Sequence, residues 1–147
     1  MRIRKILFAT DFSTPSVRAF QAAMDLAKQN KAQLAIFHAL IPAVIYDEGE
    51  TTYPALYSQI EVESKKQAEA GLARLKARAE KAKIKTVAQM RKGPAADQIL
   101  KAAKSQRADL IVVGTHGRTG LSKLLLGSVA SRVISMADRP VLTVPGR

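Results

Sequence analysis

The 147-residue chain contains no cysteine, which excludes a disulfide framework, a thiolate metal site and a cysteine nucleophile. The missing cysteine also fits a reducing compartment. A chain of this length buries one sizeable core without cross-links, and no linker or change of composition divides it. The sequence therefore predicts a single domain over residues 1–147.

Long apolar runs are also missing, because no run approaches the roughly 20 residues that span a bilayer. Near the N-terminus, basic residues precede a short apolar run. Thr10 and Asp11 interrupt that run before it reaches the length of a signal-peptide core. We therefore expect a cytoplasmic protein without a membrane partner.

Aromatic residues are scarce, with four phenylalanines, three tyrosines and no tryptophan, so a base-stacking platform is unsupported. Acidic residues are also few, since 12 of them face 24 lysines and arginines for a net charge of +12. This charge makes contact with nucleic acid or an anionic membrane a hypothesis to weigh. The basic residues are spread mainly over expected helices and their ends, without a DNA-reading motif. We expect a solvated surface and no specific nucleic-acid partner.

Apolar runs of strand length alternate with amphipathic stretches of helix length, a pattern typical of repeated strand–helix units around a parallel sheet. In the first expected helix, Ser13 or Thr14 is the predicted N-cap and Pro15 lies in the first turn. Residues 41–53 are interpreted as a loop. The expected strands are 3–10, 33–39, 84–90, 109–113 and 139–145, and the expected helices are 15–30, one from 54 that ends near 81–83, 95–106 and a last one after residue 127.

Glycines mark the passage from the fourth strand to the last helix. The apolar run 109–113 ends at Gly114, Gly117 follows, and nine residues later come Gly127 and Ser128, the predicted N-cap of the last helix. Glycines here let backbone N–H groups approach an anion, and a helix N-terminus adds about half a positive charge. The segment predicts an anionic ligand, although two loop glycines alone more often serve a turn.

The spacing Gly-x2-Gly-x9-Gly-Ser resembles that of the ATP-binding branch of the universal stress protein family. The resemblance covers the whole chain, including residues 9–13 (Ala-Thr-Asp-Phe-Ser), the pair His38-Ala39 and the last strand, 139–145. It implies an α/β fold: one doubly wound, Rossmann-like sheet of five parallel strands in the order 3-2-1-4-5, with helices on both faces, similar to adenine-nucleotide α-hydrolases. The ligand crevice then lies at the carboxyl ends of strands one and four.

By matching positions, the resemblance assigns nucleoside contacts to Thr10 and Asp11 and a backbone contact with adenine to Ala39. The glycine segment would hold the phosphates. ATP, with Mg²⁺ or Mn²⁺ on its phosphates, is the expected ligand, without a dedicated metal site or catalytic residue in the protein. The implied ligand contacts are Thr10, Asp11, Ala39, Val113, Gly114, His116, Gly117, Arg118, Gly127, Ser128 and Val129.

Several of these residues have a second interpretation. Asp11 equally fits the capping of the first helix. For His116, the role of an exposed loop residue or of a ribose-phosphate contact is favoured over acid–base catalysis. For His38, a structural role is favoured over a functional one.

Other charged and polar positions are weaker candidates. Lys123 and Arg132 are interpreted as solvated cations more often than as phosphate partners. The acidic residues of the 41–53 loop are interpreted as solvated rather than as a cation site. Ala130 stands where the family often has a hydroxyl residue, which leaves one phosphate hydrogen bond open.

The resemblance implies an ATP-binding homodimer with a role in stress response or regulation, paired through the last strand, Val141–Val144. We expect no enzyme, and at most slow ATP hydrolysis, because the chain lacks a Gly-x4-Gly-Lys-Ser/Thr loop and an obvious base for a water molecule. One alternative is a related adenine-nucleotide hydrolase or ligase, although the loop after the first strand lacks glycine. The other is a nucleotide-independent binding module that uses the basic surface.

Overall fold

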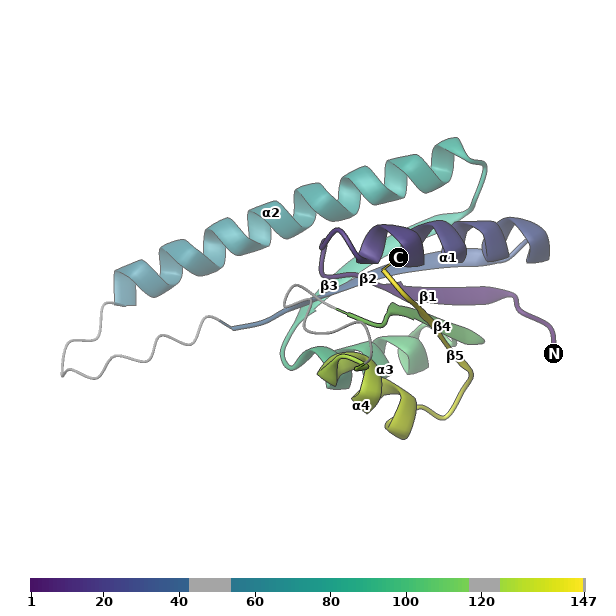
Figure 1. Ribbon diagram of the computed structural model, residues 1–147. Helices are drawn as coiled ribbons and strands as arrows, with labels where there is room; N and C mark the ends of the chain where they lie inside the picture. Colours follow the sequence, from purple (N-terminus) through teal and green to yellow (C-terminus); the bar gives the residue numbers. More distant parts are fainter. Residues whose placement is uncertain (43–53, 117–124, 147) are drawn as a thin grey trace.

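The computed structural model describes residues 1–42, 54–116 and 125–146 (Figure 1). Strands and helices alternate along the chain, as the sequence pattern predicts. The elements are β1 (Lys5–Ala9), α1 (Ser16–Asn30), β2 (Gln33–Leu40), α2 (Pro54–Lys81), β3 (Thr86–Lys92), α3 (Ala95–Ser105), β4 (Leu110–Gly114), α4 (Ser128–Met136) and β5 (Val141–Val144).

The five strands form one parallel sheet in the order β3-β2-β1-β4-β5, which confirms the expected topology. The central strand β1 pairs with β2 and β4, so that Ile6 lies between Leu34 and Leu110. Because all strands point the same way, their carboxyl ends meet at one edge of the sheet and their amino ends at the other. We call these the carboxyl edge and the amino edge.

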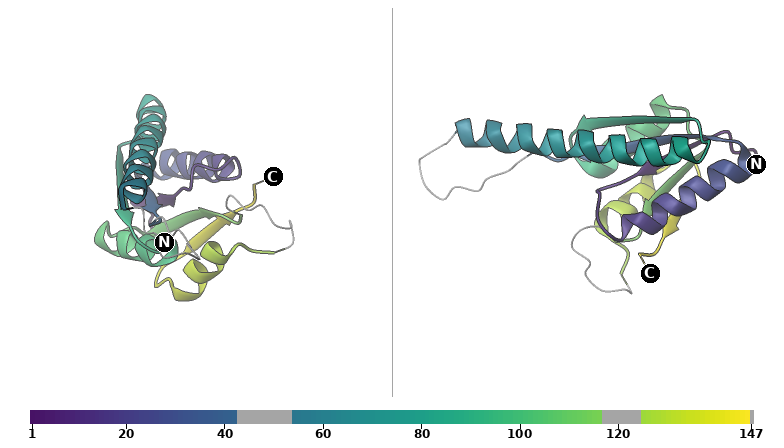
Figure 2. Two further views of the ribbon diagram at one scale, coloured as in Figure 1. Left: turned by 90° about the vertical axis from the view of Figure 1, so that its left-hand side faces the viewer. Right: turned by 90° about the horizontal axis from the view of Figure 1, so that it is seen from above.

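Helices cover both faces of the sheet, with α1 and α2 on one side and α3 and α4 on the other (Figures 1 and 2). The alternation of side chains along β1 supplies both cores. Ile6 and Phe8 belong to the core under α1 and α2, and the ring of Phe8 lies 5.4 Å from that of Phe20. Leu7 packs in the other core, with Val133 of α4. Burial on both faces explains why the central strands are almost continuously apolar.

The helix α2 extends well beyond the sheet (Figures 1 and 2). Its 28 residues span about 42 Å, whereas the strands are far shorter. Ala68, Leu72 and Ala79 in its later turns are buried. Leu56 and Val62, nearer its start, are exposed. Only the second part of this helix therefore contributes to the core. None of the helices among the described residues has the length and hydropathy that a membrane span requires.

The start of α1 differs from the prediction. Pro15 occupies the N-cap position, and no side-chain hydrogen bond caps the helix, so the predicted capping by Ser13 or Thr14 is wrong. The backbone supplies the contact instead, because the N–H of Ser16 donates to the carbonyl of Ser13 at 3.1 Å. The fixed φ of proline already suits this geometry.

The helix α2 ends at Lys81, within the predicted range of residues 81–83. Lys83 adopts a left-handed backbone conformation with a φ of 65°, which stops the helix. The following strand begins at Thr86, two residues after the predicted start, although Ile84 is buried. Most of the predicted loop, residues 43–53, lies outside the described part of the chain.

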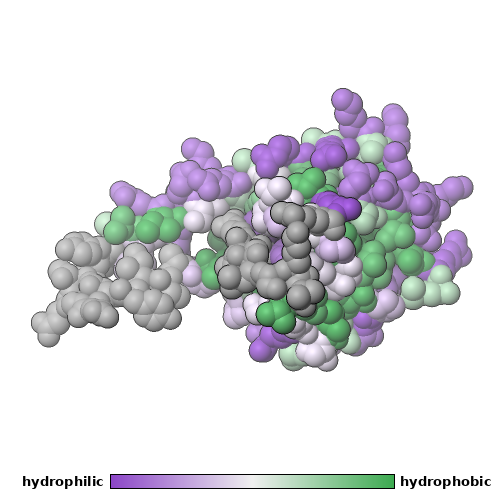
Figure 3. All heavy atoms as spheres, in the orientation of Figure 1, coloured by the Kyte–Doolittle hydropathy of each residue, from purple (hydrophilic) through white to green (hydrophobic). Residues whose placement is uncertain are grey.

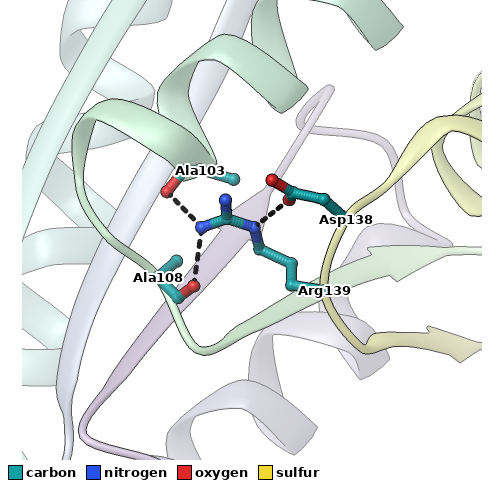
Figure 4. A network of polar contacts seen from close by, with 4 residues as sticks. All are labelled: Ala103, Ala108, Asp138 and Arg139. Atoms are coloured by element: carbon teal, nitrogen blue, oxygen red, sulfur yellow. Dashed lines mark hydrogen bonds and ion pairs between the residues drawn. The ribbon is translucent and has the colours of Figure 1, made fainter.

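An arginine fixes the connection between α4 and β5 (Figure 4). The Nη1 group of Arg139 donates to the carbonyl oxygens of Ala103 and Ala108, both at 2.8 Å. Its Nε donates to Oδ1 of Asp138 at 2.7 Å, and this hydrogen bond lowers the pKa of the Asp138 carboxyl below its usual value. The guanidinium thus ties the entry of β5 to the end of α3.

Candidate functional site at the carboxyl edge

The end of β1 is held to β2 by two hydrogen bonds. The N–H of Thr10 donates to the carbonyl of Phe37 at 2.9 Å. The carbonyl of Thr10 lies 2.7 Å from Nδ1 of the buried His38 ring. Because a carbonyl can only accept, Nδ1 carries the proton in this contact. His38 therefore has a structural role, the interpretation that the sequence favours.

The hydroxyl of Thr10 is used within the loop that follows β1. It accepts a hydrogen bond from the N–H of Phe12 at 2.9 Å. Ser16 donates its hydroxyl proton to the carbonyl of Ser13 at 2.7 Å, so the 3.2 Å contact between Thr10 and Ser16 is a donation by Thr10. Thr10 is 7% exposed. Its side chain shapes the loop and offers little surface to a ligand.

Asp11 takes part in the same loop, because its Oδ1 accepts the N–H of Ser13 at 2.9 Å. This is an Asx turn within the loop, and Asp11 does not cap α1, the alternative role that the sequence suggests. A carboxylate has about four acceptor positions, so an Asx turn alone does not use them all. The turn and a ligand contact by Asp11, which is half-buried, are therefore compatible.

Phe12 is a structural residue that sequence reasoning missed. Its φ of 62° is left-handed, an uncommon conformation for an aromatic residue. Its ring lies 4.5 Å from the ring of His38. On the other side, a Cβ atom at Gly71 of α2 would come within 2.7 Å of the ring, so only glycine leaves room for it. Contacts of Phe12 with β2 and α2 thus fix the conformation of this loop.

The end of β4 and the start of α4 are joined by their backbones. The N–H of Gly127 donates to the carbonyl of Thr115 at 2.7 Å. A Cβ atom at Gly127 would lie 2.9 Å from that oxygen, so the contact requires glycine. A Cβ atom at Gly114 would meet His116 at an ordinary 3.5 Å, so packing of the described residues does not require glycine there.

The first turn of α4 presents N–H groups at this edge. Gly127 is the N-cap and Ser128 the first helical residue, so the prediction of Ser128 as N-cap is wrong by one position. No side chain of the described residues caps this helix. The first N–H bonded to Gly127 is that of Ser131, at 2.9 Å, which leaves the preceding N–H groups of the helix at its positive end.

His116 lies beside this turn with one ring nitrogen satisfied. Its Nδ1 lies 2.9 Å from the hydroxyl of Thr115. Its Nε2 is buried and has no hydrogen-bond partner among the described residues. A buried polar atom without a partner is costly, and a ligand oxygen would satisfy it. The residues present therefore fit an anionic group next to the start of α4.

The structure brings most of the predicted residues to one edge. Thr10 and Asp11 follow β1, and Val113 and Gly114 end the adjacent β4. Ala39 lies near the end of β2 and is 9% exposed. The first turn of α4 and His116 complete the group. Val129, in that turn, is 39% exposed. The remaining assigned or weighed residues of the glycine segment, Gly117, Arg118 and Lys123, lie outside the described residues.

Arg132 is not part of this group. Its Nη2 lies 3.3 Å from Oδ1 of Asp97, so the side chain bridges α4 and α3. The acidic residues of the 41–53 loop lie outside the described part of the chain. Within the described ranges, no group of three or more histidine, aspartate or glutamate side chains is placed to hold a metal ion.

Two cavities lie near the site rather than over the glycine segment. One of about 360 Å³ opens at the ends of β2 and β3 beside α2, where Leu40 and Lys92 are among its walls. The other, of about 160 Å³, lies between α1 and α2 and includes Thr10, Arg74 and Arg78. Neither cavity is lined by residues of the β4–α4 connection.

Comparison with known proteins identifies the family of this chain. Residues 2–145 match the Universal stress protein family. The chain belongs to this family. Universal stress protein MJ0531 of Methanocaldococcus jannaschii is 35% identical over 142 residues, which cover 96% of this chain and 81% of that protein.

Solved structures of similar proteins give the same fold. The structure of the protein MJ0577 has a TM-score of 0.84 at 24% identity. The alignment covers 99% of the present chain and 97% of the MJ0577 chain. A universal stress protein solved in complex with cAMP has a TM-score of 0.73 at 27% identity, with 98% of each chain covered. The first likeness shows the fold, and the second is to a family member that holds an adenine nucleotide.

Proposed function

We propose that the chain binds ATP at the carboxyl edge and acts as a cytoplasmic regulator in stress response. The observation that carries the proposal is the start of α4, which no side chain of the described residues caps and which the close contact of Gly127 with Thr115 holds against the end of β4. A helix N-terminus fixed in this way is suited to phosphate. The cAMP complex of a 27% identical relative supports an adenine nucleotide as the ligand class.

Each part of the site has a distinct task in this proposal. The N–H groups at the start of α4, the hydroxyl of Ser128 and Nε2 of His116 bind phosphate oxygens. Asp11 accepts hydrogen bonds from ribose hydroxyls or the adenine amino group, while the backbone of Ala39 contacts the adenine edge. Thr10 holds the loop in shape through its hydroxyl.

A divalent cation, Mg²⁺ or Mn²⁺, accompanies the phosphates in this proposal. The described residues offer no cluster of three carboxylate or histidine ligands. The nucleotide itself would therefore supply much of the coordination, an arrangement that Mg²⁺ commonly adopts with phosphates and water.

We propose a binding protein rather than an enzyme, with hydrolysis slow or absent. The Nδ1 atom of His116 is hydrogen-bonded to the hydroxyl of Thr115, and in this proposal the ring binds phosphate. The sequence offers no evident partner that would make His116 a base for water. A related hydrolase or ligase is less well supported, because the loop after β1 is filled by Phe12 and an Asx turn instead of glycines.

The proposed assembly is a homodimer through β5. This strand lies at the edge of the sheet, next to β4 alone. Leu142 is 36% exposed on it. Antiparallel pairing with β5 of a second copy would cover the edge.

Thermal unfolding of the nucleotide-stripped protein tests the ligand. At about 100 times its dissociation constant, magnesium ATP stabilises a protein by roughly 2.7 kcal/mol, or about 5–10 °C for a domain of this size. Unchanged unfolding with ATP and with cAMP would contradict nucleotide binding. In that case the basic-surface binding module becomes the leading function.

The variant Ser128→Asp tests the phosphate position. A carboxylate in the first turn favours helix formation, so the fold is kept, but it repels phosphate. We expect the stabilisation by ATP to disappear. Lys66→Gln, on the exposed surface of α2, lowers the net charge by the same amount and should leave the ATP effect unchanged. Equal behaviour of the two variants would exclude this phosphate position.

A further inference from the structure

Three helix-to-strand turns at the amino edge share one geometry. They follow α1, α2 and α3 and lead into β2, β3 and β4. In each turn a backbone N–H donates to the carbonyl of a buried alanine five residues earlier, the Schellman pattern of helix ends. The three pairs are Ala32 with Ala27 at 2.8 Å, Ile84 with Ala79 at 3.1 Å, and Ala108 with Ala103 at 2.9 Å.

A cation occupies the left-handed position of all three turns. The φ angles are 52° at Lys31, 65° at Lys83 and 54° at Arg107. Glycine is the usual residue at this position because it has no Cβ atom. The three side chains are exposed. The turn geometry therefore does not explain these cations, since it favours glycine.

The helix dipole does not account for them either. A positive side chain near a helix C-terminus is favourable, but the last turns of α1, α2 and α3 already carry Lys28, Lys81 and Lys104. The three left-handed cations are additional to these. Their shared feature is their place at one edge of the sheet.

The sheet order sets these cations in a row. Lys83 precedes β3, Lys31 precedes β2 and Arg107 precedes β4, while Arg2 and Arg4 precede the intervening β1. With about 4.8 Å between strands, four strands span about 14 Å. Hydrophilic side chains project from this side of the molecule, on the right in Figure 3. The basic edge consists of the exposed residues Arg2, Arg4, Lys28, Lys31, Lys81, Lys83, Lys85, Lys104 and Arg107.

The basic edge has little internal compensation. Within the described residues none of its nine cations forms an ion pair, although the charge of Lys104 acts on the Asp138 carboxyl and helps to lower its pKa. Asp109 accepts the backbone N–H groups of Arg4 and Lys5, at 2.8 and 2.9 Å. Glu80 lies 3.7 Å from Lys76, which is not part of the edge. A row of unpaired cations of this kind is matched by a polyanion.

We propose that the basic edge binds the phosphate backbone of nucleic acid without reading its sequence. The row is linear, as a phosphate backbone is, and its segments contain no aromatic residue for base stacking. They expose one large apolar side chain, Met1, which disfavours anchoring in a membrane. The lack of a DNA-reading motif concerns base recognition and leaves backbone binding open. This proposal is independent of ATP binding at the opposite edge.

The test uses the variant with Lys31→Gly, Lys83→Gly and Arg107→Gly. Glycine suits the left-handed positions, so the cations are removed while the turns are kept. Binding to a fluorescent duplex DNA of mixed sequence is followed by anisotropy over a range of salt concentrations. We expect binding to weaken about tenfold or more at low salt, and the slope of log affinity against log salt to fall by about 2 to 3.

The control carries Arg18→Gln, Lys65→Gln and Lys66→Gln, three exposed cations away from the amino edge. It loses the same charge and should bind much as the unchanged protein does. Equal losses in both triple variants would overturn the proposal, because general charge would then explain the binding. The absence of duplex binding at low salt would also overturn it.

Two further measurements distinguish backbone binding from sequence-specific binding and from membrane binding. A second duplex of unrelated sequence should bind with the same affinity, and a strong preference would contradict backbone recognition. Phosphatidylserine vesicles should not bind in preference to the duplex, and vesicle binding without DNA binding would overturn the proposal. If the glycine variant fails to fold, Arg4→Gln, Lys28→Gln and Lys85→Gln remove three other cations of the edge.

Discussion

Three turns at the amino edge and the β4–α4 connection at the carboxyl edge use glycine and left-handed backbone in opposite ways. At the amino edge, Lys31, Lys83 and Arg107 adopt left-handed conformations without glycine. At the carboxyl edge, Gly127 has an ordinary φ of −61°, and glycine is needed there because the backbone of Thr115 lies so close. Glycine at the start of α4 therefore serves close contact rather than conformational freedom. In the turns at the amino edge, a lysine or an arginine stands at the position where glycine is usual.

The largest expected effect comes from Gly127→Ala. Its Cβ atom would lie 2.9 Å from the carbonyl oxygen of Thr115, so the two backbone segments must separate. We expect a loss of about 1–3 kcal/mol in the free energy of unfolding, measured by chemical denaturation. Gly114→Ala is the matched control, since its Cβ atom has an ordinary 3.5 Å contact and should cost less than about 1 kcal/mol. Equal losses would refute the distinction between the two glycines.

A somewhat smaller effect is expected from Arg139→Met at the amino edge. The substitution keeps an apolar stem but removes the donors to the carbonyls of Ala103 and Ala108. We expect the free energy of unfolding to fall by about 1–2 kcal/mol in thermal or chemical denaturation. Arg107→Gln is the control, because Arg107 is exposed and makes no ion pair within the described residues. A loss for Arg107→Gln as large as that for Arg139→Met would contradict this difference.

The single substitution Lys83→Gly should stabilise the protein slightly, by up to about 1 kcal/mol, because glycine adopts the left-handed conformation with less strain. Lys85 is two residues later and is not left-handed. Lys85→Gly should therefore cost about 0.5–1 kcal/mol. The two unfolding midpoints should move in opposite directions, and a shift of both in the same direction would argue against conformational strain at Lys83.

The smallest expected effect is on how the stability of the protein depends on pH. The hydrogen bond from Arg139 lowers the pKa of Asp138 from its ordinary 3.8. A carboxyl with a lowered pKa stabilises the folded state above its unfolded pKa, and this contribution is lost as the pH falls through the folded pKa. Asp138→Asn should therefore shift the urea midpoint slightly at pH about 6 and not at pH about 2. Asp138 is exposed, so the difference is small, and an equal shift at both pH values would exclude the ionic contribution.

The sheet and its order were predictable because apolar strand segments and a whole-chain family resemblance pointed to one topology. The ends of α1 and α2 also agree with the prediction, and α3 ends one residue earlier than predicted. The left-handed conformations of Lys31, Lys83 and Arg107 were not predicted, because glycine is the usual signal for them. The predicted caps at Ser13 and Ser128 failed because backbone groups, rather than side chains, start those helices.

The local structure of the site depends on contacts between distant segments. Asp11 and Gly127 were predicted as site residues, and they lie at the carboxyl edge. The left-handed conformation of Phe12 and the use of the Thr10 hydroxyl inside the loop were not predicted. Both depend on neighbours from other elements, such as His38, which a local pattern cannot reveal.

The contact between Phe12 and Gly71 has an evolutionary consequence. The aromatic ring occupies the space that any side chain at position 71 would need. A larger residue at position 71 thus becomes acceptable only after position 12 has become smaller. Across relatives with this loop, the two positions should vary as a pair, so that drift in the middle of α2 is limited by a residue that follows β1.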